Sequence, residues 1–545
     1  MPDIRFRDYE TLSPFEIKDE LIRLARANSQ KSAHMFLNAG RGNPNWIATT
    51  PREGFFLLGQ FAMTESRRVM EQPGLGGMPA KPGIADRMVM WLDDHMHMPG
   101  AEFLAGMLLH VSQNFGFAPD DFVHELVDSI IGDNYPVPDR MLVHAEQVVR
   151  KYLDFAMASN KPPPGTFDLY AVEGGTAAMC YIFKALKANR ILKQGDTIAL
   201  GTPIFTPYLE MPELEDYALN VVTVNADQDN DFQFGNAEIA KLEDPKIKAF
   251  FVVNPGNPTS VALSPQTIAS LVKLVNTKRP DLILLTDDVY GTFVPGFRSL
   301  MAELPHNTIG VYSFSKYFGC TGWRLGVIAL HQDNILDKML AKLPEAEKKA
   351  LDRRYHTLTM EPRNIRMIDR FVADSRDVAL NHTAGLSLPQ QVMMTLFSLS
   401  ELMDSAKDYQ RRCIEIVKQR VTNCVHGMGI EVDRGPYFAA YYGEFDFEYW
   451  IRHHLGDELV DWMQKNIHPL DIVFRLAEDY GIVLLNGSGF KGPDWSCRVS
   501  FANLGDDSYE DIGRAIRSVA RGYVQAFRVS KGLPPLAATE RARVT

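Results

Sequence analysis

The chain has 545 residues, of which 46% are hydrophobic and 23% charged, as in ordinary globular proteins. Its 57 basic and 68 acidic side chains give a net charge of −11. This balance argues against a nucleic-acid or anionic-membrane partner, because such binding draws on clustered Lys and Arg. The length predicts two domains, or one large α/β domain with a satellite.

Cysteine usage and the absence of long apolar runs predict a cytoplasmic protein. No CxxC pair occurs, and in so large a chain widely spaced cysteines are typical of reduced thiols. The N-terminal sequence has no uninterrupted apolar segment, so we expect no secretory signal. No apolar run approaches the ~20 residues that span a bilayer. The five cysteines are Cys180, Cys320, Cys413, Cys424 and Cys497.

Residues 1–130 are predicted to form an N-terminal arm with a helical insertion, because residues 51–130 are rich in Met, His and Phe and lack strand patterns. Short β-rich runs then alternate with amphipathic segments, which predicts βαβ units and a mostly parallel sheet. The expected strands cover residues 167–172, 197–200, 247–253, 281–287, 308–314 and 325–330, with helices at 176–192 and 265–277.

Strongly helical sequence fills residues 331–425, and the last hundred residues mix helix with strand. We therefore expect an α/β fold: a large domain at 131–375 with a mostly parallel mixed sheet flanked by helices. A smaller α+β domain with an insertion is expected at 376–530. The polar, proline-containing residues 531–545 are expected to form a flexible tail.

Five short motifs carry chemistry, and the first is "EGGTAAM". Its glycine pair closes a strand and opens a helix, where free N–H groups and the helix dipole attract an anion. Gly175 and the Thr176 hydroxyl are the candidate donors. A plain helix start is the alternative.

The next two motifs follow apolar runs. "NPGNPTS" comes after "FFVV" and presents Asn257 at the sheet edge, where open α/β sheets bind ligands; it forms a turn in either case. "DDVY" ends the run "LILLT", so Asp287 and Tyr290 could serve a cationic or phenolate ligand. An ordinary strand end is the alternative.

The fourth motif, "SFSKYFGCTGWRLG", places one lysine among groups that suit a phosphate. Nearby cations and desolvation would keep Lys316 neutral enough to attack a carbonyl. Ser313, Ser315 and Arg324 together suit a phosphate, with the arginine supplying a fork of donors. A surface lysine beside a structural arginine is the alternative.

The fifth motif, "CRVSFA", puts Arg498 on an apolar strand, where it requires a carboxylate partner. A buried structural ion pair would explain it equally well. Taken together, the motifs describe a carbonyl held by lysine, a phosphate on a helix N-terminus and a carboxylate facing a ring nitrogen. That combination predicts pyridoxal phosphate as cofactor.

The motif order G-G-T, P-x-F, N-P-x-N-P-T, D-x-x-Y, S-x-S-K and then Arg resembles the fold-type I aminotransferase superfamily over about residues 130–510. The resemblance implies that Lys316 binds the cofactor aldehyde and later moves the substrate Cα proton. It implies that Asp287 keeps the pyridine nitrogen protonated. Asn257 and Tyr290 would hydrogen-bond the phenolate oxygen.

The same resemblance implies the remaining contacts. Phe205 would stack on the ring, and Tyr135 would reach a neighbouring subunit's phosphate, so a homodimer at least, and a higher homo-oligomer, is expected. Arg498 would grip the substrate α-carboxylate, with a backbone contact from Gly40. The phosphate would be held by Gly175, Thr176, Ser313 and Arg324.

The chain is longer than ordinary members by more than a hundred residues, at 51–130, around 331–370 and around 440–470. With "RGNPNW", "SFSKYFGCTGWRLG" and "NHTAGLSLPQQ", this long form resembles the aspartate 4-decarboxylases. The resemblance implies β-decarboxylation of L-aspartate to L-alanine and CO₂, with aminotransferase side activity. The alternative is a dicarboxylate aminotransferase with insertions. Transcription regulators with such domains carry a basic N-terminal helix-turn-helix, for which the first fifty residues leave too little room.

A second substrate carboxylate needs a cation or strong donors, and Arg41, Arg376 and Lys18 are candidates. We rank Arg376 first, because it precedes the loop "NHTAGLS", which in related enzymes faces a partner's active site. No metal is expected: "DDHMHM" and "RHH" lack further ligands at suitable spacing.

Overall fold

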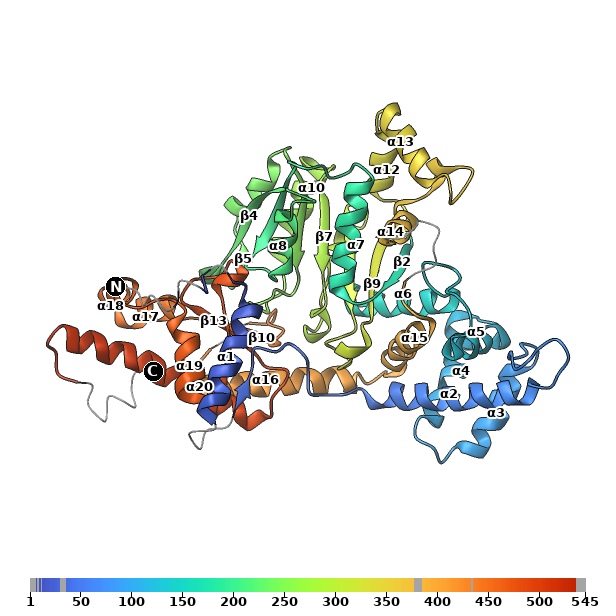
Figure 1. The fold of residues 1–545 in the computed structure, drawn as a ribbon, viewed down its shortest axis with the longest axis horizontal. Coiled ribbons are helices and arrows are strands. Elements are labelled where there is room, and N and C mark those ends of the chain that lie inside the picture. The colour runs from blue at the N-terminus through green and yellow to red at the C-terminus, as the bar shows by residue number, and fades with distance from the viewer. Residues whose placement is uncertain are drawn as a thin grey trace.

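The computed structural model describes residues 6, 9–10, 12–29, 36–376, 385–432 and 435–535. Within these residues, a central eight-stranded sheet has the strand order β2-β9-β8-β7-β6-β3-β4-β5 (Figure 1). The strands are β2 Phe167–Val172, β3 Thr197–Thr202, β4 Asn220–Asp227, β5 Gln233–Phe234, β6 Ile247–Val253, β7 Ile283–Asp287, β8 Thr308–Ser313 and β9 Gly326–His331.

Strands β8, β7, β6, β3 and β4 pair in parallel, while β9 and β5 pair antiparallel to their neighbours. The predicted mostly parallel mixed sheet is therefore confirmed. The central strands are nearly continuous apolar runs because helices cover both faces of the sheet. The sequence prediction missed β4, whose side chains are mostly exposed or half-buried and form no apolar run.

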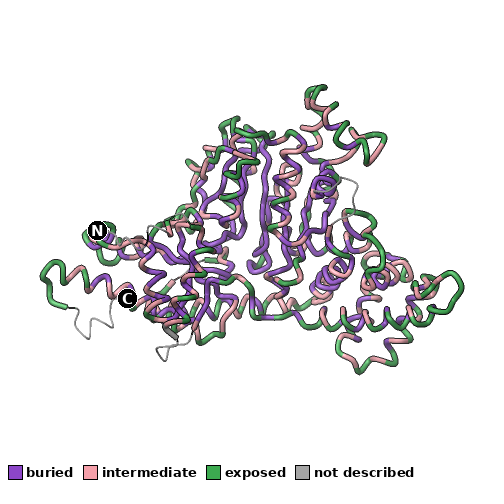
Figure 2. Tube along the Cα trace, viewed as in Figure 1, coloured by how far each residue is buried: buried purple, intermediate pink, exposed green. Residues whose placement is uncertain are grey.

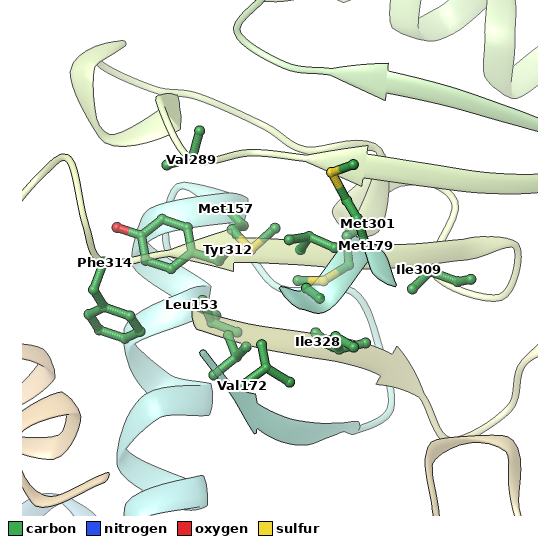
Figure 3. Packing of buried hydrophobic residues seen from close by; sticks show 14 of the residues in the cluster. Leu153, Met157, Val172, Met179, Val289, Met301, Ile309, Tyr312, Phe314 and Ile328 are labelled. Atoms are coloured by element: carbon green, nitrogen blue, oxygen red, sulfur yellow. The ribbon is translucent and has the colours of Figure 1, made fainter. Parts of the chain in front are cut away.

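Helices α6 Val143–Ala158, α7 Gly175–Ala188 and α10 Pro265–Thr277 flank the sheet. In Figure 3, Leu153 and Met157 of α6 lie near Tyr312 of β8 and Val172 of β2. The buried chain in Figure 2 follows this sheet and the inner sides of its helices. This packing fixes the strand ends that carry the chemical motifs.

A second, smaller unit contains the antiparallel sheet β10-β13-β12, formed by Tyr442–Asp446, Ser496–Ser500 and Leu485–Asn486. Helix α16 packs along α20, and α1 packs on α19. Short strand β1, Leu37–Asn38, pairs with β11, Ile482–Val483, so the N-terminal arm is tied to this unit. The helices are α1 Pro14–Ser29, α16 Asp408–Met428, α19 Asp471–Tyr480 and α20 Asp506–Ser530.

The helical prediction for residues 51–130 is confirmed, and these helices share a hydrophobic core with α15, Leu388–Met403. They project beside the sheet at the lower right of Figure 1. The insertion comprises α2 Thr49–Val69, α3 Ile84–His95, α4 Ala101–Phe115 and α5 Pro119–Ile131.

The surplus residues around 331–370 and 440–470 are mostly helical, apart from strand β10 in the second segment. Their helices are α12 Ile335–Lys342, α13 Glu345–Tyr355, α14 Met367–Ser375, α17 Phe447–Leu455 and α18 Asp457–Asn466. Within the described residues, short helices α8 Pro207–Glu213, α9 Asn236–Ala240 and α11 Leu300–Glu303 are the remaining α-helices. Across the described residues, no helix combines the length and apolar character needed to span a bilayer.

Candidate active site

Three parallel strands end together and bring the predicted motifs to one edge of the sheet. The register places Asp287 at the end of β7 opposite Val253 of β6 and Val311 of β8. The segments that follow β6 and β8 carry Asn257 and Lys316. Because ligands in open α/β sheets bind at the carboxyl ends of the strands, this edge is the expected place for a site.

A cavity of ≈ 230 Å³ lies at this edge. Larger hollows occur elsewhere on the molecule, but this one is distinguished by the motif residues that line it. Ten of the thirteen predicted site residues line it: Gly175, Thr176, Phe205, Asn257, Asp287, Tyr290, Ser313, Lys316, Arg324 and Arg498.

One end of the cavity is built for a phosphate. Helix α7 begins at Gly175, and Arg324 Nη2 lies against the preceding Gly174, donating to the Glu173 carbonyl at 3.2 Å. Gly174 has φ +88°, and a Cβ there would lie 2.4 Å from Arg324 Nη2. Ser313 Oγ is 3.0 Å from Ser315 Oγ. An anion bound here would meet the N-terminal dipole of α7, the Arg324 guanidinium and the two serine hydroxyls.

Asp287 is a buried carboxylate with an open acceptor. Its Oδ2 accepts from Tyr208 Oη at 3.3 Å, while Oδ1 has no hydrogen-bond partner among the described residues. Burial raises the pKa of Asp287 to about 6, against the opposing effects of the Val289 N–H, Tyr208 and the charge of Lys316. A cationic N–H placed at Oδ1 would favour the ionised carboxylate, as a protonated ring nitrogen does.

Lys316 reaches across to the N-terminal segment. Its Nζ donates to the Gly42 carbonyl at 3.1 Å, and Tyr441 Oη donates to the same carbonyl at 2.8 Å. Tyr290 Oη donates to Tyr442 Oη at 3.1 Å. Burial raises the pKa of Tyr290 well above its ordinary value, so it stays a hydrogen-bond donor at neutral pH.

Arg498 is fully buried without a counter-ion among the described residues. Its Nη1 donates to Asn257 Oδ1 at 3.0 Å and Nη2 to the Gly40 carbonyl at 2.8 Å, while Nε has no hydrogen-bond partner. The guanidinium lies 4.3 Å from the Tyr442 ring centroid. A buried ion pair, the alternative explanation for this residue, is not present in the described chain. An unpaired buried cation is costly, which favours an anionic ligand as its partner.

The N-terminal segment fastens the lysine-bearing loop. Trp46 Nε1 donates to the Tyr317 carbonyl at 3.0 Å, and Arg52 donates to the carbonyls of Phe318 and Gly319 at 3.1 and 2.7 Å. A Cβ on Gly319 would lie 1.9 Å from the Trp46 carbonyl. The segments meet so closely that only glycine fits there.

Three predicted residues do not line the cavity. Gly40 contributes its carbonyl to Arg498. Arg376 is buried and pairs with Asp139 at 2.6 Å, and Tyr135 is 75% exposed. Their contacts with substrate or with a neighbouring subunit's cofactor stay predictions. Part of the loop that supported the choice of Arg376, residues 381–384, lies outside the described residues.

Sequence reasoning missed several residues that line the cavity, including Phe15, Gly42 and Tyr442. Gly42 lies in "RGNPNW", a motif used only for resemblance. Tyr442 starts β10 in "YYGEFD", and nothing in that stretch alone signals a site. Both reach the cavity through pairing of segments distant in sequence.

The cavity residues fit pyridoxal phosphate. Asp287 Oδ1 and Arg498 Nε are unpartnered polar atoms among the described residues, one suited to a ring N–H and the other to a carboxylate. Because Gly174 has no side chain, the Arg324 guanidinium can lie against it at the anion-binding end of the cavity. Lys316 supplies the amine that holds the aldehyde.

Comparison with known proteins agrees with this chemistry. The sequence model of "Aminotransferase class I and II" matches residues 171–355. A Pseudomonas protein named bifunctional aspartate aminotransferase and L-aspartate beta-decarboxylase is 48% identical over 525 residues, 96% of this chain and 98% of its own length. The chain belongs to the class I and II aminotransferase family. Enzymes of this family depend on pyridoxal phosphate, which is therefore the cofactor of this family member.

More distant relatives share the fold. An aspartate aminotransferase of Sulfurisphaera tokodaii is 28% identical over 59% of this chain and 69% of its own length. The structure of a Rhizobium meliloti aspartate aminotransferase superposes with a TM-score of 0.58 at 14% identity, covering 95% of this chain and 98% of that one. A Thermus thermophilus aspartate aminotransferase variant gives 0.55 at 16% identity, covering 96% and 100%. The fold-type I architecture expected from the motifs is confirmed.

Proposed function

We propose that this enzyme removes the β-carboxylate of L-aspartate to give L-alanine and CO₂, and transaminates aspartate as a side activity. The observation that carries the proposal is the near full-length relative whose name states both activities. The cavity supports it, because Arg498 is a buried cation without a counter-ion in the described chain and suits an amino-acid carboxylate.

The cofactor would be held by groups at both ends of the cavity. Arg324, Ser313 and the N-terminus of α7 suit its phosphate, and the amine of Lys316 suits its aldehyde. When bound, pyridoxal phosphate supplies an electron sink that stabilises negative charge on the substrate carbon next to its nitrogen.

The chain's own side chains supply the remaining chemistry. Arg498 binds the α-carboxylate and orients the amino acid, and Asn257 holds that guanidinium in place at 3.0 Å. When the substrate's amino group takes its place on the cofactor, the free amine of Lys316 can remove the proton of the substrate Cα and return it. Asp287 holds a proton on the ring nitrogen, because its carboxylate is buried and has an open acceptor.

Decarboxylation breaks the bond between Cβ and the carboxylate, releases CO₂ and adds one proton at Cβ. Among the described lining residues, the cations Lys316, Arg324 and Arg498 each have another task. The β-carboxylate would then meet donors without a fixed counter-ion, and weak binding of this kind favours departure as neutral CO₂. Arg376 of a neighbouring subunit remains our candidate for a loose contact.

The assembly and location are also proposals. We infer a homodimer at least, with Tyr135 reaching the neighbouring subunit's phosphate, since that exposed side chain does not line its own chain's cavity. A cytoplasmic location is supported by five cysteines that are all free. The domain boundaries at 1–130, 131–375 and 376–530 stay a proposal. The sheet, the insertion and the smaller unit each have a hydrophobic core, but residues 386–403 pack in the first two cores and residues between 6 and 39 contribute to the third.

Purified enzyme incubated with aspartate alone tests the function. A β-decarboxylase releases CO₂ and alanine in equal amounts over many turnovers without added keto acid. An aminotransferase with insertions stops after a single half-turnover and yields oxaloacetate. The second result would replace the proposed function with the alternative.

A further inference from the structure

A second phenol lies beside Tyr290 and has no assigned role. Tyr442 is the first residue of β10, is buried, lines the cavity and accepts the Tyr290 hydroxyl at 3.1 Å. Strand β10 pairs with β13, the strand that carries Arg498. The smaller unit therefore delivers both a carboxylate-binding cation and a phenol to the end of the large sheet.

The backbone around Tyr442 leaves room for its hydroxyl and for little else. A Cβ on Gly42 would lie 2.5 Å from Tyr442 Oη and 3.4 Å from Lys316 Nζ. The Gly42 carbonyl accepts from both Lys316 Nζ and Tyr441 Oη. Gly42 thus binds the catalytic amine through its carbonyl and lies close to the Tyr442 hydroxyl.

Hydrogen-bond counting gives Tyr442 a task. Tyr290 has one hydroxyl proton, which in the described chain goes to Tyr442 Oη. If Tyr290 donates that proton to the phenolate oxygen of the cofactor, its own oxygen is left free to accept. Tyr442 Oη, 3.1 Å away, is then placed to donate to it.

We propose, on the basis of the function above, that Tyr442 is a positioning residue for Tyr290: it reverses its hydrogen bond and donates to Tyr290 Oη whenever Tyr290 donates to the cofactor. A hydroxyl that accepts a hydrogen bond is a stronger donor, because successive bonds polarise one another. Tyr442 thereby strengthens the bond that stabilises the cofactor's negative oxygen.

The surroundings of Tyr290 favour a neutral phenol over a phenolate. Burial raises the pKa of Tyr290 and Tyr441 well above their ordinary values. The charged groups near the pair are Arg498 on β13, Lys316 after β8 and Asp287 at the end of β7. None of the three lies between the two hydroxyls, which bond directly to each other.

The ring of Tyr442 has a separable role. The Arg498 guanidinium lies 4.3 Å from its centroid, a distance at which the ring face attracts a cation. Tyr442→Phe keeps the ring and removes only the hydroxyl, whereas Tyr442→Leu removes both. The two substitutions therefore separate the positioning of Tyr290 from support of the arginine.

The test is a pH titration of the visible absorbance of the bound cofactor. A donor that stabilises the cofactor's negative phenolate oxygen makes the adjacent Lys316 nitrogen, which holds the cofactor, bind its proton less tightly. Losing that donor therefore raises the apparent pKa of this nitrogen. We expect Tyr290→Phe to raise it by roughly one to two units. Tyr442→Phe is expected to raise it by roughly half a unit, because it weakens one bond without removing it. The double variant should titrate like Tyr290→Phe alone, since Tyr442 acts only through Tyr290.

An unchanged or lowered apparent pKa in Tyr442→Phe would overturn the proposal, as would a double variant that shifts further than Tyr290→Phe. A dicarboxylate inhibitor such as succinate should bind Tyr442→Phe as tightly as wild type, and Tyr442→Leu several-fold more weakly. Tyr449→Phe, which loses a bond to Asp229 outside the cavity, is the matched control and should titrate like wild type. If wild type takes up no cofactor, the proposed function fails instead.

Discussion

Replacing Gly42 by alanine tests whether the narrow contact between the N-terminal segment and the cavity matters for catalysis. A Cβ at this position would lie 2.5 Å from Tyr442 Oη, whereas real Cβ atoms essentially never come closer than 3.0 Å. Either the hydroxyl or the segment must therefore move by at least about 0.5 Å. The same Cβ would lie 3.4 Å from Lys316 Nζ, so the lysine itself is barely touched.

The expected cost is large for activity and small for folding. Displacements of about 1 Å in an active site cost on the order of 10²-fold, so we expect kcat/KM for aspartate to fall by roughly ten- to a hundredfold. Overpacking costs about 1–3 kcal/mol in a closed core, and the adjoining cavity lowers that figure for Gly42→Ala. Steady-state kinetics and urea unfolding measure the two effects.

Gly322 provides the control, because a Cβ there meets nothing within 4 Å although the residue lies close to the cavity. Gly322→Ala should leave kcat/KM within about twofold of wild type. Wild-type kinetics in Gly42→Ala would refute the reasoning, because the segment would then yield without disturbing the phenol pair.

Four further substitutions separate function from stability. Arg498→Met should raise KM for aspartate by about a hundredfold or more. It should not lower the free energy of unfolding, because it removes a buried cation without a counter-ion in the described chain. A large loss of stability would show that Arg498 has an unrecognised partner. Asp287→Asn should lower kcat by roughly 10²–10⁴-fold and weaken cofactor retention, so near-normal turnover would contradict its role. Arg52→Met removes three hydrogen bonds to carbonyls and should destabilise by about 2–5 kcal/mol in urea unfolding, unless the lysine-bearing loop is held in another way. Burial raises the pKa of Asp288 to about 8, so unfolding above about pH 4 releases its proton, and the free energy of unfolding falls as pH rises. Relative to Asp288→Asn, the wild type should lose about 2–3 kcal/mol of stability between about pH 5 and 7. A difference that stays constant with pH would contradict the raised pKa.

The sheet and the residues at its strand ends were predictable because local sequence carries the signal. Strands β6, β7 and β8 are apolar runs, and each chemical motif directly follows its strand. Parallel pairing then brings Asp287 next to its neighbouring strands without further information. The predicted cofactor contacts within this chain lie at or after the ends of these strands, except Gly175 and Thr176, which follow β2, and Phe205, which follows β3.

The missed residues depend on contacts between distant segments. Gly42 and Tyr442 line the cavity in segments that are held by the pairing of β1 with β11 and of β10 with β13. Trp46 binds a carbonyl 271 positions along the chain. No periodicity or turn signal in a single sequence specifies such pairs, since register across hundreds of residues is set by the assembled core.

Mapping the lysine that carries the cofactor tests the central claim most directly. Borohydride reduction fixes the cofactor to the amine that holds it, and peptide mass spectrometry then locates the added mass. We predict a single modified peptide containing Lys316, and loss of both the modification and the cofactor's visible absorbance in Lys316→Ala. Modification of another lysine, or a Lys316→Ala enzyme that retains absorbance and turnover, would contradict the assignment of this cavity as the active site.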